Sequence, residues 1–219
     1  MATTGTPTVV VIVGGSAVTM GNWIDKVNSI VDVWYPGEEG GHAVAAVLSG
    51  AYNPGAKLPI TFPVSEAQLP LVYNHKPTGR GDDYENLTGL PLFPFGYGLS
   101  YTTFEYSNLM IDKPTAKKGD NITVSFVVTN TGKLAGDEVA QLYLRDQIAS
   151  VARPVQALKG FERIHLAAGA SKTIKLTLNP EDFEMLNEKM ETVIEPGDFT
   201  IMIGSSSRDI RLKKTVTLQ

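Results

Sequence analysis

The stretch Phe93-Pro94-Phe95-Gly96-Tyr97-Gly98-Leu99-Ser100-Tyr101 stands where two different sequence patterns meet. Its aromatic side chains supply a large apolar area, and its two glycines allow a backbone approach that a Cβ atom would resist. Such a segment is suited to holding two domains rigidly together. The residues that we expect to form this domain junction are Phe93, Phe95, Gly96, Tyr97, Gly98 and Tyr101.

Downstream of the junction, short alternating apolar and polar segments are separated by turn signals. The run from Ile122 to Val128 alternates and stops at Asn130-Thr131-Gly132, which is a turn signal. Gly160 indicates a β-bulge or a close backbone contact. About seven such strands in little more than a hundred residues are typical of an all-β, immunoglobulin-like sandwich. The expected strands are 104–111, 122–128, 139–144, 156–161, 172–178, 199–204 and 210–218.

Upstream of the junction, the pattern is β-α-β. The β-branched run Val9-Val10-Val11-Ile12-Val13 is typical of a strand covered on both faces, as in a parallel sheet. Trp23, Val27 and Ile30 then recur at helical spacing, which predicts a helix. A second strand is expected over 30–35.

A further helix is predicted over 41–48, because Glu38 and Glu39 precede it and Gly50 follows it. Two strands and two helices are too few to complete a sheet that is covered on both faces. We therefore interpret this part as an α/β fragment, and we expect the isolated chain to expose an apolar patch and to associate.

Between the two patterns lies a proline- and glycine-rich segment that still contains many apolar residues, which indicates an ordered connection. The expected organisation is an α/β part over 1–64, a connection with the junction over 65–103, and the sandwich over 104–219.

Composition excludes several classes of function. The net charge of -4 comes without a basic run, so neither nucleic acid nor an anionic membrane is expected as a partner. The sequence has no cysteine, and its three histidines are far apart, so we expect neither a metal site nor a cofactor. No signal peptide is expected at the start, and the compartment stays open.

Several motifs in order resemble the C-terminal region of glycoside hydrolase family 3, the family of β-glucosidases and β-xylosidases. They run from the end of the first strand, through the turn into the helix and the segment that follows it, to the junction and the sandwich. The resemblance covers essentially the whole chain. The motifs are Val11-Ile12-Val13-Gly14-Gly15-Ser16, Trp34-Tyr35-Pro36-Gly37-Glu38-Glu39-Gly40-Gly41, Asn53-Pro54-Gly55-Ala56-Lys57-Leu58-Pro59-Ile60-Thr61-Phe62-Pro63, Pro91 to Phe104, Val128 to Gly132, Gly136 to Tyr143, and Leu158-Lys159-Gly160-Phe161.

The resemblance implies a fibronectin-III-like sandwich and a parent enzyme that is a retaining glycosidase. Such enzymes use a carboxylate nucleophile and a carboxylic acid/base about 5 Å apart. In the family these come from an N-terminal (β/α)8 barrel and from an earlier part of the second domain, so the resemblance assigns no catalytic residue to this chain. It implies the barrel and the rest of the α/β domain as partners, in the same chain or as a second chain. It also implies an oligosaccharide or aryl β-glycoside as the substrate of the complete enzyme.

Three groups of residues are weighed as alternative functional sites. The loop residues Arg80, Asp82, Asp83 and Tyr84 are of types that bind sugars, although a solvated loop or an interdomain ion pair is the stronger interpretation. Glu38 and Glu39 are better explained by the helix start than by catalysis. The two tryptophans, Trp23 and Trp34, are expected in packing rather than in a sugar subsite.

Two further functional hypotheses stay open. A stand-alone carbohydrate-binding or scaffolding module would present an exposed aromatic strip, of which the sequence gives little sign. Tyr101, Phe104 and Tyr106 are better explained by the junction. An autonomous hydrolase with an unfamiliar site is the weakest hypothesis. The sequence therefore favours a structural portion of a β-glycosidase that is inactive alone.

Overall fold

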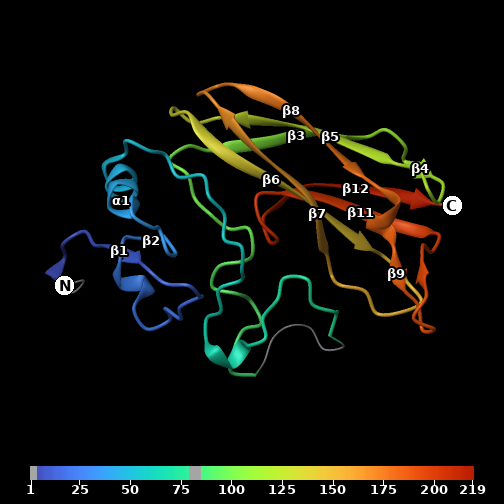
Figure 1. Ribbon diagram of the computed structural model, residues 1–219, viewed down its shortest axis with the longest axis horizontal. Helices are drawn as coiled ribbons and strands as arrows, with labels where there is room; N and C mark the ends of the chain where they lie inside the picture. Colours follow the sequence, from blue (N-terminus) through green and yellow to red (C-terminus); the bar gives the residue numbers. More distant parts are fainter. Residues whose placement is uncertain (1–3, 79–84) are drawn as a thin grey trace.

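The structure is a computed structural model that describes residues 4–78 and 85–219. A small α/β region at the N-terminus and a β-sandwich at the C-terminus lie side by side, joined by a long connection, and the two termini lie at opposite ends of the molecule (Figure 1). This architecture confirms the predicted fold class, an α/β fragment followed by an all-β sandwich. No helix of the described residues is both long and apolar enough to cross a membrane.

The α/β region is built on one pair of parallel strands. Strand β1 (Val9–Ile12) pairs with β2 (Ser29–Asp32), with Val11 opposite Val31. Helix α1 (Gly40–Ser49) follows the pair and ends at Gly50, whose left-handed conformation lets its N–H donate to the carbonyl of Val47. The prediction of a helix at this place is thus confirmed.

Two predictions for this region were wrong in part. The apolar spacing of Trp23, Val27 and Ile30 forms only the short 3-10 helix η2 (Ile24–Lys26), since three apolar residues specify little more than one turn. The second strand ends at Asp32 instead of residue 35. The Asp32 carboxylate accepts a hydrogen bond from the Trp34 N–H at 3.2 Å. Trp34 also has a positive φ of 50°, which an extended strand does not allow.

The connection is ordered by its own hydrogen bonds. Its 3-10 helix η3 (Glu66–Gln68) carries Gln68, a buried residue whose side-chain oxygen accepts from the Val64 N–H at 2.7 Å. The Gln68 amide donates to the carbonyls of Thr88 and Leu90 at 2.6 and 3.0 Å. Phe62 and Phe93 form a backbone bridge, so the segment just before the connection lies beside the start of the junction.

The sandwich consists of two main sheets and a short two-stranded one, and the strands of the main sheets pair antiparallel except for β4, which pairs with β12 in parallel. One main sheet has the order β4-β12-β11-β6-β7 and the other the order β3-β5-β8, while β10 pairs with β9. A 3-10 helix, η4 (Pro180–Phe183), precedes β9. The strands are β3 (Phe104–Ile111), β4 (Thr115–Ala116), β5 (Ile122–Asn130), β6 (Gly136–Asp146), β7 (Ala157–Leu166), β8 (Ser171–Leu178), β9 (Met185–Leu186), β10 (Thr192–Val193), β11 (Gly197–Gly204) and β12 (Ile210–Leu218).

Seven of these strands coincide with the predicted ones, and alternation explains why. Every second residue of β5 is buried, and its buried side chains meet those of β6 and β11 in one core between the sheets. The predicted irregularity at Gly160 is confirmed as a register shift, because Gly160 pairs with Leu142 whereas Leu158 pairs with Tyr143.

Candidate functional site

The junction segment packs against the outer face of strand β6, and its glycines make the close approach feasible. Gly96 has a φ of 80°, and a Cβ atom on it would collide with the side chain of Gln141. A Cβ atom on Gly98 would collide with the backbone carbonyl of Ala56. The junction therefore packs so closely on its neighbours that there is no room for a side chain at Gly96 or Gly98.

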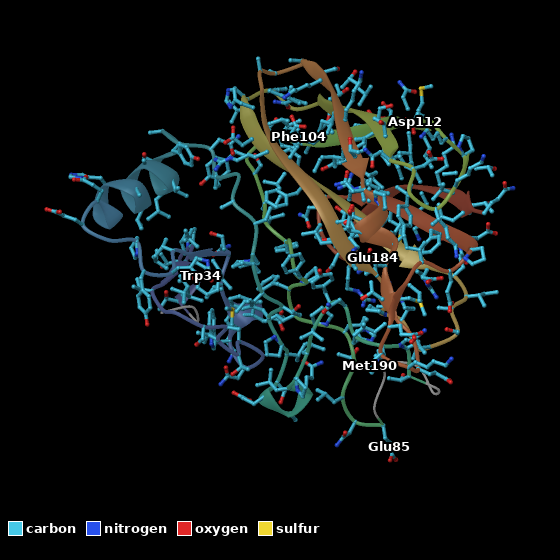
Figure 2. All side chains as sticks on the ribbon, turned by 45° about the vertical axis from the view of Figure 1, so that its right-hand side comes forward. Trp34, Glu85, Phe104, Asp112, Glu184 and Met190 are labelled. Carbon is cyan, nitrogen blue, oxygen red and sulfur yellow. The ribbon has the colours of Figure 1, made fainter. Side chains whose placement is uncertain are left out.

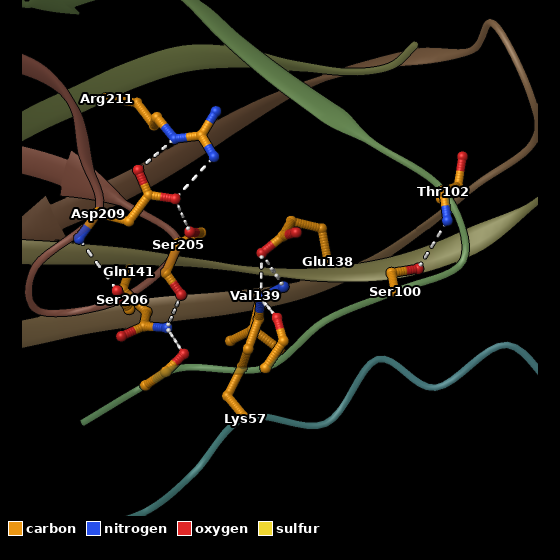
Figure 3. A network of polar contacts seen from close by, with 12 residues as sticks. Lys57, Ser100, Thr102, Glu138, Val139, Gln141, Ser205, Ser206, Asp209 and Arg211 are labelled. Atoms are coloured by element: carbon orange, nitrogen blue, oxygen red, sulfur yellow. Dashed lines mark hydrogen bonds and ion pairs between the residues drawn. The ribbon is translucent and has the colours of Figure 1, made fainter. Parts of the chain in front are cut away.

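Gln141 is the centre of the buried hydrogen bonds at this contact (Figure 3). Its amide nitrogen donates to the carbonyls of Gly96 at 3.2 Å and Ser205 at 2.7 Å. Its side-chain oxygen accepts from the hydroxyl of Tyr143 at 2.5 Å. Burial raises the pKa of this hydroxyl, which keeps Tyr143 a neutral donor. One amide thus ties the junction to both β6 and the loop after β11.

Aromatic rings fill the space beneath the junction. Phe95 stacks on Tyr73 with centroids 4.3 Å apart, and Tyr73 meets Tyr143 of the sandwich edge to face at 5.9 Å. A second series leads from Tyr97 through Phe93 to Phe62. Its last member reaches Trp34 of the α/β region at 6.2 Å. The first series thus joins the junction to the sandwich, and the second joins it to the α/β region.

A buried ion pair links the segment after α1 to the sandwich. Lys57 Nζ lies 3.1 Å from Glu138 Oε1, with the two side chains only 12% and 6% exposed, and Lys57 also donates to the carbonyl of Gly98 at 3.0 Å. Burial and the neighbouring Glu138 raise the pKa of Tyr106, so its hydroxyl stays neutral there. Removing one partner of such a pair leaves a buried charge uncompensated.

Two asparagines fix the C-terminal end of the junction. The side-chain oxygen of Asn53 accepts from the Ser100 hydroxyl at 2.9 Å and from the Tyr101 N–H at 2.7 Å, and its amide donates to the carbonyl of Ala135 at 2.8 Å. Asn130 is fully buried and accepts from the hydroxyl of Thr102 at 2.6 Å. The position of the α/β region on the sandwich is therefore set by directional bonds as well as by apolar contact.

A cluster of polar side chains at the surface also joins the α/β region to the sandwich. Arg163 Nε donates to Asp137 Oδ2 at 2.9 Å, and Arg163 Nη2 donates to the hydroxyl of Tyr52 at 3.3 Å. His165 Nδ1 lies 2.6 Å from Asp137 Oδ1. Burial acts to raise the pKa of Asp137, but the hydrogen bonds from His165 and Arg163 outweigh it and hold that pKa below its usual range.

The structure gives each predicted junction residue a definite place. Gly96 is buried, while Phe93, Phe95, Tyr97 and Gly98 are partly buried. Tyr101 remains exposed, although its hydroxyl donates to the carbonyl of Val47 in α1 at 2.8 Å. The predicted substrate loop with Arg80, Asp82, Asp83 and Tyr84 lies outside the described residues.

Of the other weighed residues, Glu39 and Trp34 make contacts within the α/β part of the chain. Glu39 is exposed and lies 2.7 Å from the ring of His42, one turn along α1. Trp34 packs on Phe62 in the α/β region, apart from the sandwich that carries Phe104 and Glu184 (Figure 2).

Sequence reasoning missed Tyr73, Gln141 and the pair Lys57–Glu138. Their partners are far away in the sequence, so no local pattern marks them. The only signal was that Lys57 and the run from Gly136 to Tyr143 fall within the quoted motifs.

A cavity of about 280 Å³ lies between the connection and the sandwich. Tyr73, His75, Gln156 and Arg208 provide its polar lining, together with Ser207 and Thr61, and none of its described lining residues is a carboxylate. Hydrolysis of a glycoside with retention requires two carboxyl groups about 5 Å apart. The described lining of this cavity does not supply them.

Two segments of the chain match known protein families. Residues 1–101 match the glycosyl hydrolase family 3 C-terminal domain, and residues 138–207 match the fibronectin type III-like domain. The chain belongs to glycoside hydrolase family 3. The junction lies at the end of the segment that matches the glycosyl hydrolase family 3 C-terminal domain.

Individual relatives agree along nearly the whole chain. A beta-xylosidase of Formosa agariphila is 43% identical over 98% of the chain, and a periplasmic beta-glucosidase of Salmonella typhimurium is 41% identical over 95%. The crystal structure of a beta-glucosidase from Listeria innocua in complex with glucose matches 99% of the chain with a TM-score of 0.95 and 34% identity. The chain spans only 30%, 28% and 31% of the length of these three family 3 relatives.

Proposed function

We propose that this chain is the C-terminal structural portion of a retaining, exo-acting β-glycosidase of the β-glucosidase or β-xylosidase type. Residues 1–64 contribute to its α/β domain, 65–103 form the connection with the junction, and 104–219 form the sandwich. The complete enzyme hydrolyses terminal β-linked sugars, and this portion neither attacks nor protonates the glycosidic bond. Its task is to complete the α/β domain and to hold it rigidly on the sandwich.

The observation that carries this proposal is the contrast between a firmly fixed junction and an uncovered α/β region. The junction has buried hydrogen bonds and a buried ion pair. Strands β1 and β2, in contrast, contain no buried residue. Val13 just after β1, Tyr35 and Leu48 are exposed large apolar side chains, as expected for a surface that another part of an enzyme covers.

The proposed partners follow from the same surfaces. The remaining part of the α/β domain and an N-terminal (β/α)8 barrel cover β1, β2 and α1, either in the same chain or as a second chain. The similar relatives support a larger parent, because each is about three times as long as the matched chain. The two catalytic carboxylates belong to those parts.

The experiment is an activity assay on the purified chain with aryl β-glucosides and aryl β-xylosides. We expect no hydrolysis above the rate without protein. A matched sample of a complete family 3 β-glucosidase shows that the assay works. Turnover that persists through further purification of the chain would contradict the proposal.

A further inference from the structure

The outer face of β7 remains open where the junction covers its neighbour β6. The register places Phe161 opposite Gln141, Arg163 opposite Val139, and His165 opposite Asp137. The alternate residues Ile164 and Leu166 enter the core, so Phe161, Arg163 and His165 point outward. Gln141 lies beneath Gly96, whereas the side chains of Phe161, Arg163 and His165 are 64%, 53% and 69% exposed.

Hydrogen bonds hold the polar members of this surface in fixed positions. One carboxylate oxygen of Asp137 accepts a hydrogen bond from Arg163, and the other lies next to the ring of His165. Arg163 also reaches the hydroxyl of Tyr52, which stands beside β7 at the end of the segment after α1. We call Phe161, Arg163, His165 and Tyr52 the β7 strip. Fixed polar groups lose little conformational freedom when a ligand binds.

The β7 strip combines the exposed aromatic rings of Phe161 and Tyr52 with several hydrogen-bonding groups. A pyranose ring has an apolar face of C–H groups that can pack on an aromatic ring, and a rim of hydroxyl groups that both donate and accept. The Arg163 guanidinium donates to such hydroxyl groups, and the oxygens of Tyr52 and Asp137 accept from them. Because the charges of Arg163 and Asp137 offset each other, a neutral ligand suits the surface.

We propose that the β7 strip binds a neutral, β-linked oligosaccharide along strand β7, with one sugar ring stacked on Phe161. The strip is long enough for more than one ring, because Phe161 and His165 are about 13 Å apart along an extended strand. The choice of β-linked sugars rests on the proposed function, whereas the binding itself does not require catalysis.

A polypeptide suits this surface less well. Stable protein contacts bury about 800 Å² on each partner and have an apolar centre of several side chains. The β7 strip offers only two large side chains with apolar area, Phe161 and Tyr52, and they are surrounded by polar groups. Protein docking at this place is therefore the competing outcome of the test.

The experiment is a calorimetric titration of the purified chain with cellohexaose and with xylohexaose, together with amide NMR spectra. We expect saturable binding of at least one of them with a Kd of about 1 mM or tighter, and shifts of the amides of β7. Phe161→Ala should weaken the binding about tenfold or more, since it removes the stacking platform. His165→Ala tests the other end of the strip and should weaken it less.

The matched control is Ile148→Ala, which removes another exposed apolar side chain of the sandwich and should leave binding unchanged. Thermal unfolding of all variants shows that they are folded. Absence of saturable binding by the wild-type chain would overturn the proposal, as would equal binding by Phe161→Ala. Light scattering in which Phe161→Ala abolishes self-association without any sugar binding would identify a protein contact instead. Because no outcome depends on hydrolysis, the inactivity expected of the chain is tested separately.

Discussion

The two regions of this chain bury their apolar residues in opposite ways. In the sandwich, Phe126, Ile201 and Val216 have no exposed surface, and each lies on a strand with neighbours on both sides. In the α/β region, β1 and β2 have only each other, and no residue of either strand is buried. The difference shows that a sequence of β-branched residues specifies a buried strand, but only neighbouring elements bury it.

One substitution in each region tests this difference in burial. Ile201→Ala should lower the free energy of unfolding by about 4 kcal/mol, because it leaves a cavity in the core. Ile12→Ala in β1 should lower it by only about 1 kcal/mol, since Ile12 is already partly exposed. Chemical denaturation followed by circular dichroism measures both. Equal losses would mean that the α/β region has a core of its own.

The link between the regions should be the next most sensitive place. Lys57→Ala leaves Glu138 buried without its partner and should cost about 3 kcal/mol. The double variant Lys57→Met with Glu138→Leu should recover most of that loss. Both tryptophans, Trp23 and Trp34, lie in the α/β region, so tryptophan fluorescence reports that region alone.

In Lys57→Ala the fluorescence transition should therefore precede the circular dichroism transition. A single coincident transition with an unchanged midpoint would show that the ion pair does not hold the regions together.

Two glycines with positive φ separate backbone conformation from close packing. Gly96→Ala should destabilise the chain by about 2–3 kcal/mol, because it adds a collision with Gln141 to an unfavourable backbone conformation. Gly119→Ala is the matched control, since Gly119 has a φ of 93° with open space around it, and should cost about 1 kcal/mol. Thermal unfolding measures the difference. Equal costs would argue against tight packing at the junction.

A substitution in the surface cluster around Asp137 should change the free energy of unfolding least, and this change should depend on pH. The pKa of Asp137 is lowered in the folded chain, so its stabilising contribution is present above the usual carboxyl pKa and is lost as the pH falls through the folded value. Asp137→Asn should therefore destabilise the chain by at most about 1 kcal/mol at neutral pH and by nothing at about pH 2. Denaturation at several pH values tests this, and a difference independent of pH would contradict it.

Much of the fold could be predicted because its signals are local. Alternation and turn residues located the seven long strands of the sandwich, and β3 and β12 begin and end where predicted. Gly50 marked the end of α1 for the same reason. The predicted helix after Trp23 was wrong in part, because three apolar residues at helical spacing do not distinguish an α-helix from the short 3-10 helix η2.

The site was predictable only in its framework. The aromatic and glycine residues of the junction stand together in the sequence, whereas their partners Tyr73, Gln141 and Glu138 are brought to them by the fold. The exposure of Phe161 could not be foreseen, because it depends on the junction covering β6 and ending before β7. Alternation alone assigns a residue to a face and does not say what lies on that face.

The bonds of Asn53 also affect the order in which a newly made chain can assemble. Asn53 donates to a carbonyl that lies 82 positions later in the sequence. At about 5–20 residues per second, a ribosome needs roughly 4–16 s to synthesise that interval. During this time Asn53 has already been made, and the carbonyl of Ala135 that accepts its hydrogen bond does not yet exist. The contact that Asn53 makes with the sandwich can therefore form only after the chain has been made as far as Ala135.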